Sequence, residues 1–272
     1  MLRVIEKISA IIERELNSIG CTKLLLPQLH PADLWRKSER WEGYTAGEGI
    51  MFNLKDRQGK QFGLAPTHEE VITSIASETI NSYKQLPQCF YQIQTKFRDE
   101  IRPRFGLMRS REFIMKDGYS FHSSENDLAS FYEKMGNAYE NIFKSCGLQT
   151  VGVEADSGAI GGASSKEFMV TADAGEDSIL FTQSGSYAAN IEKAVSLPSR
   201  PIPLKDNIAE WLETPHQKTI LEVCDKNNLD PSQIIKVVIF LAQYEGEFNV
   251  PILACIRGDQ HINEVKLFNL IN

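Results

Sequence analysis

The sequence has 272 residues, of which 42% are hydrophobic and 24% are charged, and its formal net charge at pH 7 is -7. A chain of this length can bury a sizeable core as one large domain or two smaller ones, and its composition is ordinary for a globular protein. The negative charge argues against nonspecific binding of nucleic acid by the whole surface, although it leaves room for a local basic groove.

Two further classes are excluded by the pattern of the chain. The longest obvious apolar run, VVIFLA at residues 237–242, is far shorter than the roughly 20 residues of a membrane span. The opening segment MLRVIEKISAIIEREL carries glutamates inside its apolar pattern, unlike a secretory signal peptide. The five cysteines form no CxxC pair, and no histidines lie at metal-ligand spacing. We therefore expect a cytoplasmic protein with reduced thiols, no membrane partner and no protein-bound metal.

The first elements predicted are a helix and a strand. Residues 2–19 place apolar side chains at helical spacing and end at Gly20, which predicts an amphipathic helix. The segment TKLLLPQL, residues 22–29, then predicts a buried strand that closes at Pro27. The helix has no capping residue before it, and a second helical pattern is unfinished at the other end of the chain, so we expect a piece of a longer protein.

The middle of the chain predicts two strand pairs separated by a helix. Residues 51–67 alternate around the turn RQGK, which predicts a hairpin. Residues 68–86 predict a helix that stops before Pro87. Segments 88–100 and 111–122 then predict antiparallel strands joined by an arginine-rich loop.

Next come a helix, a strand, a glycine-rich loop and another strand. Residues 124–147 have apolar side chains at helical spacing, with Ser123 or Ser124 as the N-cap. Residues 149–172 supply the two strands and the loop between them.

A change in residue composition near residue 182 predicts a domain boundary. The connection SLPSRPIP is rich in proline and serine, and the chain then reads as a new unit. Helix, strand, strand and helix patterns follow at residues 216–230, 234–243, 250–258 and 262–272. We expect two domains, 1–182 and 183–272.

Five arginines are concentrated in FRDEIRPRFGLMRSREF, residues 97–113. Because strand side chains alternate, Arg98 and Glu100 are expected on one face, with Arg109 and Phe113 beside them on the partner strand. Guanidinium groups bind phosphate through a planar fork, an aromatic ring stacks on a base, and a carboxylate accepts hydrogen bonds from an exocyclic amine. This set predicts an ATP site, and the sequence has no P-loop motif. The alternative is a salt-bridged hairpin on an ordinary surface.

The same segment resembles motif 2 of class II aminoacyl-tRNA synthetases: Phe-Arg-x-Glu, a loop, then Arg-x-x-x-Phe-x-x-x-Asp. These positions are filled here by Phe97, Arg98, Glu100, Arg109, Phe113 and Asp117. The opening helix and CTKLLLPQLHPADLW resemble motif 1, and GLAPTHEEVIT is similar to the Thr-x-Glu amino-acid-binding segment of class IIa. With DSGAIGGASSKEFMV, which resembles a proline-binding loop, the whole chain resembles bacterial-type prolyl-tRNA synthetases.

The resemblance implies an α+β fold, mixed α/β, with an antiparallel sheet flanked by helices over residues 1–182. Residues 183–272 would be the incomplete N-terminal part of an inserted α/β editing domain. The family forms prolyl-adenylate from proline and ATP, transfers proline to tRNA(Pro), and hydrolyses mischarged alanyl-tRNA(Pro) in the insertion. It also implies a cytoplasmic homodimer formed through motif 1.

Roles for the motif 2 residues follow from this resemblance. Arg98 would contact the α-phosphate of ATP and the proline carboxylate, and stabilise the transition state. Glu100 would face the adenine amino group, Phe113 would stack on the ring, and Arg109 would bind the distal phosphates. Mg²⁺ would accompany the ATP phosphates.

The resemblance places the proline site at Thr67 and Glu69, together with Arg98. A hydroxyl and a carboxylate two residues apart in an extended stretch would accept the two N–H groups of proline's ammonium. The alternative is a helix capping box, with Thr67 at the N-cap and Glu70 at the third helical position. Gly161 and Gly162 would form a mobile loop over the proline, or else a plain turn.

The remaining candidates are a lysine and two histidines. Lys236 interrupts an apolar strand. The resemblance places it at the 3' end of the tRNA in the editing domain, and the alternative is a guard against edge-strand aggregation. His68 and His122 are expected to be structural.

Two other functions compete with the synthetase interpretation. A stand-alone aminoacyl-tRNA deacylase would resemble only the last third of the chain and would not need the ATP-binding face. A noncatalytic synthetase-like regulator would typically have lost the arginine, glutamate and Thr-x-Glu positions that this chain keeps. Because motif 3 is not in the sequence, we expect the 272-residue chain alone to be inactive or nearly so.

Overall fold

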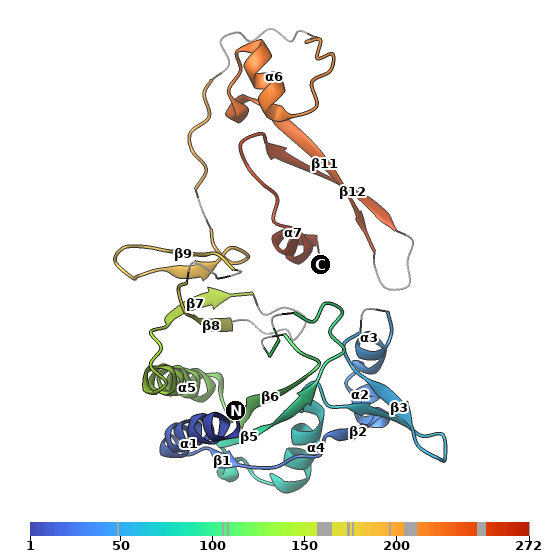
Figure 1. Cartoon of the computed structure of the whole chain (residues 1–272), viewed down its shortest axis with the longest axis vertical. Helices are drawn as coiled ribbons and strands as arrows, with labels where there is room; N and C mark the ends of the chain where they lie inside the picture. The colour runs from blue at the N-terminus through green and yellow to red at the C-terminus, as the bar shows by residue number, and fades with distance from the viewer. Residues whose placement is uncertain are drawn as a thin grey trace. The chain divides into compact units, whose positions relative to one another are not determined.

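A computed structural model describes the chain from residue 1 to residue 271. Its gaps are residues 48, 105, 108, 157–164, 173, 174, 176, 196, 204–210 and 244–248. The chain divides into two compact units, Met1–Thr150 and Val151–Asn272 (Figure 1). Each unit is described by itself.

The first unit contains two small sheets and five α-helices among its described residues. The helices are α1 (Leu2–Ser18), α2 (Ala32–Lys37), α3 (Trp41–Thr45), α4 (Glu69–Thr79) and α5 (Glu125–Ser145), with a 3-10 turn at Tyr83–Gln85. The strands are β1 (Thr22–Lys23), β2 (Leu29–Pro31), β3 (Asn53–Lys55), β4 (Gln61–Leu64), β5 (Gln88–Phe97) and β6 (Glu112–Phe121). The sheet orders are β1-β5-β6 and β2-β4-β3.

The long β5–β6 hairpin is the centre of the first unit. Its antiparallel register runs from Gln88 opposite Phe121 to Phe97 opposite Glu112, as predicted, and β1 joins β5 in parallel. Helices α1 and α5 lie side by side and cover one face of this sheet (Figure 1). There the odd-numbered Cys89 and Tyr91 pack with Leu16 of α1.

The opposite face of the sheet is apolar at one end and polar at the other. At the apolar end, Val71 and Ile72 of α4 pack with Phe90 and Phe121. Farther along β5, Gln92, Gln94 and Lys96 occupy alternate positions. This polar end of the hairpin carries the candidate site.

The predicted buried strand at residues 22–29 is mostly wrong. Thr22 and Lys23 form β1, the chain returns to a strand only at Leu29, the first residue of β2, and Leu25 between them is exposed. Beyond β1 the chain still follows β5, but side-chain amides hold it. Gln92 accepts a hydrogen bond from the Leu26 N–H at 3.1 Å, and Gln94 donates to the Leu26 carbonyl at 2.7 Å. Since proline has no N–H, a regular ladder cannot continue through the next position.

The helix predicted to reach Pro87 ends earlier, at Thr79. Ser82 then caps the short turn Tyr83–Gln85. In return, the side-chain oxygen of Gln85 accepts a hydrogen bond from the Ser82 N–H at 2.9 Å. Serine and asparagine compete for backbone hydrogen bonds in this way, which favours a cap over a continued helix.

Other predicted elements of the first unit are confirmed. Helix α1 ends before Gly20, whose φ of +88° suits glycine. Strands β3 and β4 pair around a turn in which Gly59 has a φ of +81°. The N-cap of α5 is Ser124, whose hydroxyl accepts from the Asp127 N–H.

The second unit contains a four-stranded sheet, a separate hairpin and two helices among its described residues. Its elements are β7 (Val151–Ala155), β8 (Ser165–Met169), β9 (Ile179–Phe181), β10 (Ala188–Asn190), α6 (Ile220–Asn227), a 3-10 turn (Pro231–Gln233), β11 (Ile235–Ala242), β12 (Val250–Arg257) and α7 (Glu264–Ile271). The sheet order is β8-β7-β10-β9, and β11 pairs with β12. Strands β7, β8, β11 and β12 and helices α6 and α7 agree with the predicted ones, whereas β9 and β10 were not predicted.

The predicted domain boundary at residue 182 stays a prediction. The structure adds that β9 and β10 pair across this position.

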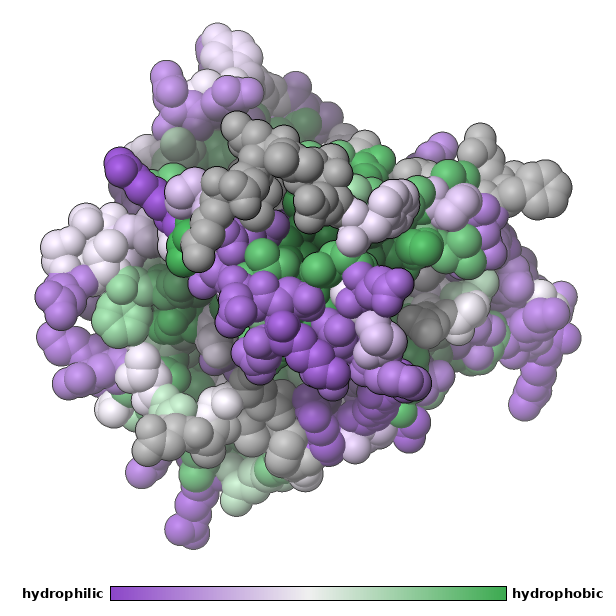
Figure 2. Space-filling model, turned by 90° about the horizontal axis from the view of Figure 1, so that it is seen from above, coloured by the Kyte–Doolittle hydropathy of each residue, from purple (hydrophilic) through white to green (hydrophobic). Residues whose placement is uncertain are grey.

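The β11–β12 hairpin exposes apolar side chains such as Ile235, Ile239 and Leu253. Figure 2 shows hydrophobic and hydrophilic side chains interspersed over the face that it views. Within the described ranges, no helix is both long and apolar enough to cross a membrane.

Candidate functional site

Arg98 lies at the end of β5, between the hairpin and the segment that precedes α4. Its backbone N–H donates to the Arg111 carbonyl at 2.9 Å, which continues the ladder past the last strand residue. Its guanidinium carbon lies 5.5 Å from the centre of the Phe113 ring. The guanidinium also donates to the Pro66 carbonyl at 3.4 Å. Arg98 therefore stands beside both an aromatic platform and the Thr67 segment.

Glu100 and Arg109 form the second contact across the hairpin. The Arg109 Nε and a Glu100 carboxylate oxygen are 2.9 Å apart. The hydrogen bond from Arg109 and that from the Arg102 N–H lower the pKa of Glu100 below its ordinary value. The Arg104 N–H donates to the Arg109 carbonyl at 3.2 Å, so the loop begins as an extension of the hairpin. The structure thus brings the four predicted residues into two neighbouring pairs.

Thr67 and Glu69 lie in the connection between β4 and α4. The Thr67 hydroxyl donates to the Glu69 carboxylate at 2.7 Å. Helix α4 begins at Glu69, and His68 occupies the N-cap position without a side-chain capping bond. The alternative of a capping box between Thr67 and Glu70 is therefore wrong.

This connection is fastened to the end of the hairpin. The Phe97 N–H donates to the Ala65 carbonyl at 3.0 Å, one residue before the Pro66 carbonyl that Arg98 contacts. The last residues of β5 therefore hold the Thr67 and Glu69 segment alongside the arginine-bearing face.

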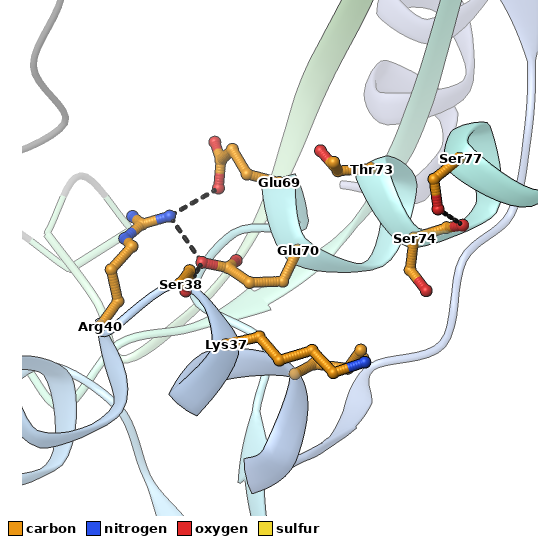
Figure 3. Close-up of a pocket in the computed structure, with 9 residues that line it drawn as sticks. Lys37, Ser38, Arg40, Glu69, Glu70, Thr73, Ser74 and Ser77 are labelled. Carbon is orange, nitrogen blue, oxygen red and sulfur yellow. Dashed lines mark hydrogen bonds and ion pairs between the residues drawn. The ribbon is translucent and has the colours of Figure 1, made fainter.

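Arg40 was not predicted, and it links two neighbouring carboxylates. Its Nη1 lies 2.9 Å from the nearer oxygen of Glu70 and 3.6 Å from Glu69 Oε2 (Figure 3). The guanidinium also lies over the rings of Trp35 and Tyr44, at 5.2 and 4.6 Å from their centres. Burial opposes its charge, but the hydrogen bond to the Tyr44 hydroxyl and the charge of Glu70 together raise the pKa of Arg40.

A pocket of about 380 Å³ opens beside this cluster, between α2 and α4 (Figure 3). Most of the residues that line it carry polar groups, among them Lys37, Arg40, Glu69, Glu70 and Ser74. Glu70 is buried and also accepts from the Ser38 hydroxyl at 2.9 Å. No sequence motif pointed to Arg40, because its partners are about thirty positions away.

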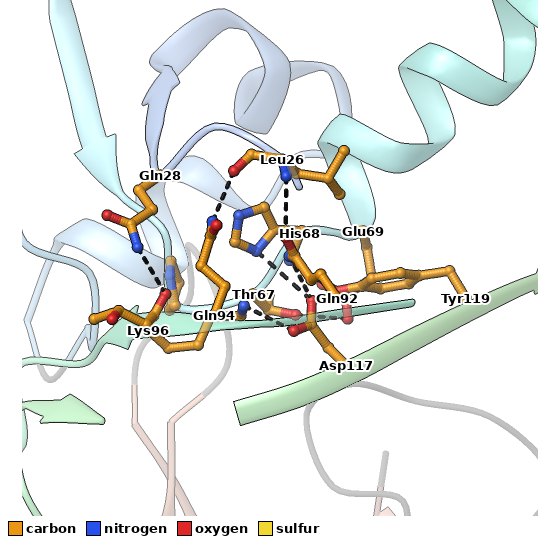
Figure 4. Close-up of polar contacts among 12 residues, drawn as sticks. Leu26, Gln28, Thr67, His68, Glu69, Gln92, Gln94, Lys96, Asp117 and Tyr119 are labelled. Carbon is orange, nitrogen blue, oxygen red and sulfur yellow. Dashed lines mark hydrogen bonds and ion pairs between the residues drawn. The ribbon is translucent and has the colours of Figure 1, made fainter. Parts of the chain in front are cut away.

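A buried ion pair lies beneath the site. Lys96 is fully buried, and its Nζ is 2.7 Å from Asp117 Oδ1. The other Asp117 oxygen accepts from the Gln92 amide at 2.9 Å and from the Tyr119 hydroxyl at 2.6 Å (Figure 4). The sequence signal was the polar alternation QxQxKxR at residues 92–98, which places these side chains on one strand face.

Two buried histidines share one carbonyl next to this ion pair. The Nε2 atoms of His30 and His68 each lie 2.9 Å from the Pro27 oxygen, which can only accept, so both carry the proton there. The Trp35 N–H donates to the other nitrogen of His30 at 3.2 Å. Burial and the nearby charge of Lys96 lower the pKa of His68 to about 4. These contacts agree with a structural role for His68.

The remaining predicted residues lie away from this site or outside the described residues. Gly161 and Gly162 lie outside the described residues. Lys236 lies on β11 opposite Ile256, with its side chain half-buried. His122 contacts Asp127 in the first unit at 2.8 Å, a structural contact. Among the residues described, no group of three or more histidines, cysteines or carboxylates is arranged to bind a metal ion.

Comparison with known proteins defines the class first. Residues 52–230 match the family described as tRNA synthetase class II core domain (G, H, P, S and T). The chain therefore belongs to the class II tRNA synthetase core family. The mixed helices and mainly antiparallel sheets agree with the fold class predicted from the resemblance.

Curated relatives and solved structures narrow the likeness within this class. The chain is 96% identical to the proline--tRNA ligase of Prochlorococcus marinus strain AS9601 and 61% identical to that of strain MIT 9313. In both cases the match covers 100% of this chain and 45% of the relative, so the chain spans about half the length of these relatives.

Among solved structures, the chain is similar to Giardia lamblia prolyl-tRNA synthetase in complex with prolyl-adenylate. The identity is 25% and the TM-score 0.50, over 54% of this chain and 30% of that one. It also shares the fold of Cryptosporidium parvum prolyl-tRNA synthetase complexed with halofuginone and AMPPNP, at 17% identity and a TM-score of 0.55, over 61% of this chain and 35% of that one.

Proposed function

We propose that this chain carries the ATP- and proline-binding core of a proline--tRNA ligase. The observation that carries the proposal is the position of Arg98. One guanidinium lies against the Phe113 ring and the Pro66 carbonyl, so a nucleotide on the hairpin and an amino acid at Thr67 and Glu69 would meet there. The names of the relatives supply the amino acid and the nucleotide class.

The reaction proposed for this site needs positioning and charge neutralisation more than a protein nucleophile. A carboxylate oxygen of proline attacks the α-phosphorus of ATP, the bond to the β-phosphate oxygen breaks, and pyrophosphate leaves with that electron pair. Negative charge builds on the α-phosphate oxygens in the transition state. Arg98 would contact both the carboxylate and the α-phosphate, and so align them while it neutralises this charge.

The nucleotide would be bound by the other motif 2 residues. Phe113 would stack on adenine, Glu100 would accept from its amino group, and Arg109 would bind the distal phosphates. Because Glu100 and Arg109 are paired with each other and partly exposed, ATP would exchange this ion pair for its own contacts. Mg²⁺ would arrive with the ATP phosphates as part of the substrate.

The amino group of proline would bind at Glu69 and Thr67. Glu69 Oε2 is buried and has no hydrogen-bond partner among the described residues, although Arg40 lies 3.6 Å away. A secondary ammonium brings two N–H donors and a positive charge, so it satisfies this oxygen and the Thr67 hydroxyl together. Gly161 and Gly162 remain candidates for the loop over the proline ring.

The other proposed properties rest on the resemblance alone. They are transfer of proline to tRNA(Pro), dimerisation through the motif 1 region, a cytoplasmic location, and hydrolysis of alanyl-tRNA(Pro) in a domain that includes residues 183–272. In that domain Lys236 would contact the 3' end of the tRNA.

The test uses a full-length chimaera, in which this 272-residue chain replaces the matching segment of the Prochlorococcus marinus AS9601 relative. Proline-dependent ATP–pyrophosphate exchange is the readout. We expect Arg98→Ala to lower kcat/KM by roughly 10³-fold, which is typical for loss of a preorganised charge in the transition state. Arg111→Ala is the matched control, because the Arg111 side chain forms an exposed ion pair with Asp99 and the substitution keeps the Arg111 carbonyl that Arg98 contacts. Equal losses in the two variants would contradict the proposal.

We also propose that the isolated 272-residue chain lacks this exchange activity. The chain and the chimaera would be assayed side by side at equal concentration. Exchange by the isolated chain at the rate of the chimaera would contradict this part of the proposal and leave the role of Arg98 intact.

A further inference from the structure

Cys21 and Cys89 face each other in the core of the first unit. Thr22 on β1 is paired with Phe90 on β5, so the two cysteines occupy the opposed positions one residue earlier. Their Sγ atoms lie 2.9 Å apart, and both side chains are buried in the cluster between the sheet and α1. Neighbouring strands are about 4.8 Å apart, inside the range of about 4.4–6.8 Å between the Cα atoms of disulfides.

The structure assigns to this pair a redox function: we propose that Cys21 and Cys89 are an oxidisable dithiol that peroxides convert to a disulfide. In the step, the two thiols lose two protons and two electrons, and the S–S bond forms. The oxidant, hydrogen peroxide, accepts the two protons and two electrons and is reduced to two water molecules. The proposal does not depend on the proposed ligase activity.

A small oxidant has a path to the pair. A cavity of about 200 Å³ borders Cys89 and is otherwise lined by residues that include Gly118 of β6 and Phe131 and Met135 of α5. A water molecule takes about 30 Å³ in the liquid, so a molecule of the size of hydrogen peroxide fits this cavity. The cavity therefore brings an oxidant beside Cys89, whose Sγ lies 2.9 Å from that of Cys21.

The electrostatics of the pair favour a thiolate at one of the two sulfurs, and the charge of Lys116 acts to lower the pKa of both thiols. The hydrogen bond with Cys89 lowers the pKa of Cys21 despite burial, and the charge of Lys116 acts in the same direction. The same hydrogen bond, together with burial, raises the pKa of Cys89. Since a thiolate reacts with peroxide and a neighbouring thiol then resolves the sulfenic acid, two thiols in contact can complete the oxidation between them.

The bond would join two segments far apart in the sequence. The two cysteines are 68 positions apart, and Cys89 belongs to the strand that also carries Lys96 and ends just before Arg98. A cross-link of this span restricts the unfolded chain more than the folded one. Because the sulfurs already touch, we expect oxidation to leave the fold unchanged and to raise the thermal midpoint of the first unit by roughly 5–15 °C.

The test is made on the 272-residue chain itself. The reduced protein is treated with hydrogen peroxide, its remaining thiols are alkylated, and tryptic peptides are mapped by mass spectrometry. We expect peptide Glu15–Lys23 to be linked to peptide Gln85–Lys96, with the loss of two hydrogens, and dithiothreitol to reverse the link.

Matched variants decide the interpretation. Cys21→Ser and Cys89→Ser should each abolish the link and the thermal shift. Cys146→Ser should keep both, because Cys146 is an exposed cysteine away from the pair. The proposal is overturned if Cys146 is oxidised while Cys21 and Cys89 stay reduced or progress to sulfinic acid without a link. It is also overturned if Cys21 pairs as readily with Cys146 as with Cys89.

Discussion

The two ends of the polar face of the β5–β6 hairpin use the same chemistry for different purposes. The inner end holds Lys96 and Asp117 out of water, with every oxygen of the aspartate approached by a donor or a cation. The outer end holds Glu100 and Arg109 in partial contact with solvent. An ion pair in the core is fixed, because separating it leaves a buried charge. An exposed pair exchanges its partners at little cost and can bind a ligand of matching charge.

The largest effect is expected from breaking the inner pair. Asp117→Asn leaves the Lys96 charge buried without a counter-charge, and we expect unfolding free energy to fall by about 3–5 kcal/mol. Urea unfolding would be followed by the fluorescence of Trp35 and Trp41, both buried in the first unit. The double variant Lys96→Met/Asp117→Asn should recover much of this loss. A loss below about 1 kcal/mol in the single variant would show that the pair is not the rigid element described.

A second expected effect is a dependence of stability on pH through His68. Its pKa is about 4 in the folded protein, against an ordinary value near 6.5, so the unfolded chain binds a proton first as the pH falls. The stability from neutral His68 is complete above about pH 6.5 and is lost toward pH 4, by up to about 3 kcal/mol. The groups around the ring are Lys96, His30, Asp117 and the Pro27 carbonyl.

The variant His68→Gln isolates this contribution, because glutamine keeps an N–H donor but does not titrate. The difference in unfolding free energy between the original chain and the variant should shrink steadily from pH 7 to pH 4. A difference that stays constant over this interval would contradict the assignment to His68.

The third prediction concerns Arg40, whose side chain is less buried than the Lys96–Asp117 pair and less exposed than Arg109. We expect Arg40→Ala in the chimaera to raise the KM for proline by roughly 10-fold with a much smaller change in kcat, because Glu69 loses a neighbour that orients it. Arg40→Lys should rescue only part of the effect, since lysine lacks the planar fork. The matched control is Arg36→Ala, which removes an ion pair with Asp33. Equal changes in both variants would place Arg40 outside the amino-acid site.

The smallest effect on stability is expected at the outer pair. Arg109→Gln should change the unfolding free energy by less than about 1 kcal/mol, because both partners are partly exposed. The same variant should raise the KM for ATP in the exchange assay, since Arg109 would contact the distal phosphates. Destabilisation as large as that of Asp117→Asn would contradict the proposed difference between the buried Lys96–Asp117 pair and the exposed Glu100–Arg109 pair.

Much of the fold follows from local patterns. The β5–β6 hairpin and helices α1 and α5 have clear periodicity, α5 also has a capping serine, and all three were predicted. The segment 22–29 was not, since its hydrogen bonds come from Gln92 and Gln94, side chains almost seventy positions away. Local sequence carries no information on such partners.

Part of the candidate site could likewise be predicted from the sequence, and part could not. Arg98, Glu100, Arg109 and Phe113 were predicted to share one face of two paired strands. In the structure only Phe113 of these four lies within a strand, because β5 ends at Phe97 and β6 begins at Glu112. Past these strand ends, Arg98 lies against Phe113 and Arg109 pairs with Glu100. Their functional roles stay predictions. Arg40 was missed, because only the packing of α2 and α3 against α4 brings it to Glu69 and Glu70.

The double use of the Pro27 carbonyl has a consequence for how this chain can vary. Both histidines bind a main-chain atom, and every amino acid supplies that atom. A mutation of residue 27 therefore cannot delete the acceptor; it can only displace it through the backbone. A substitution at residue 27 therefore matters only if it moves the backbone carbonyl, whereas a substitution at His30 or His68 removes the ring that donates to it.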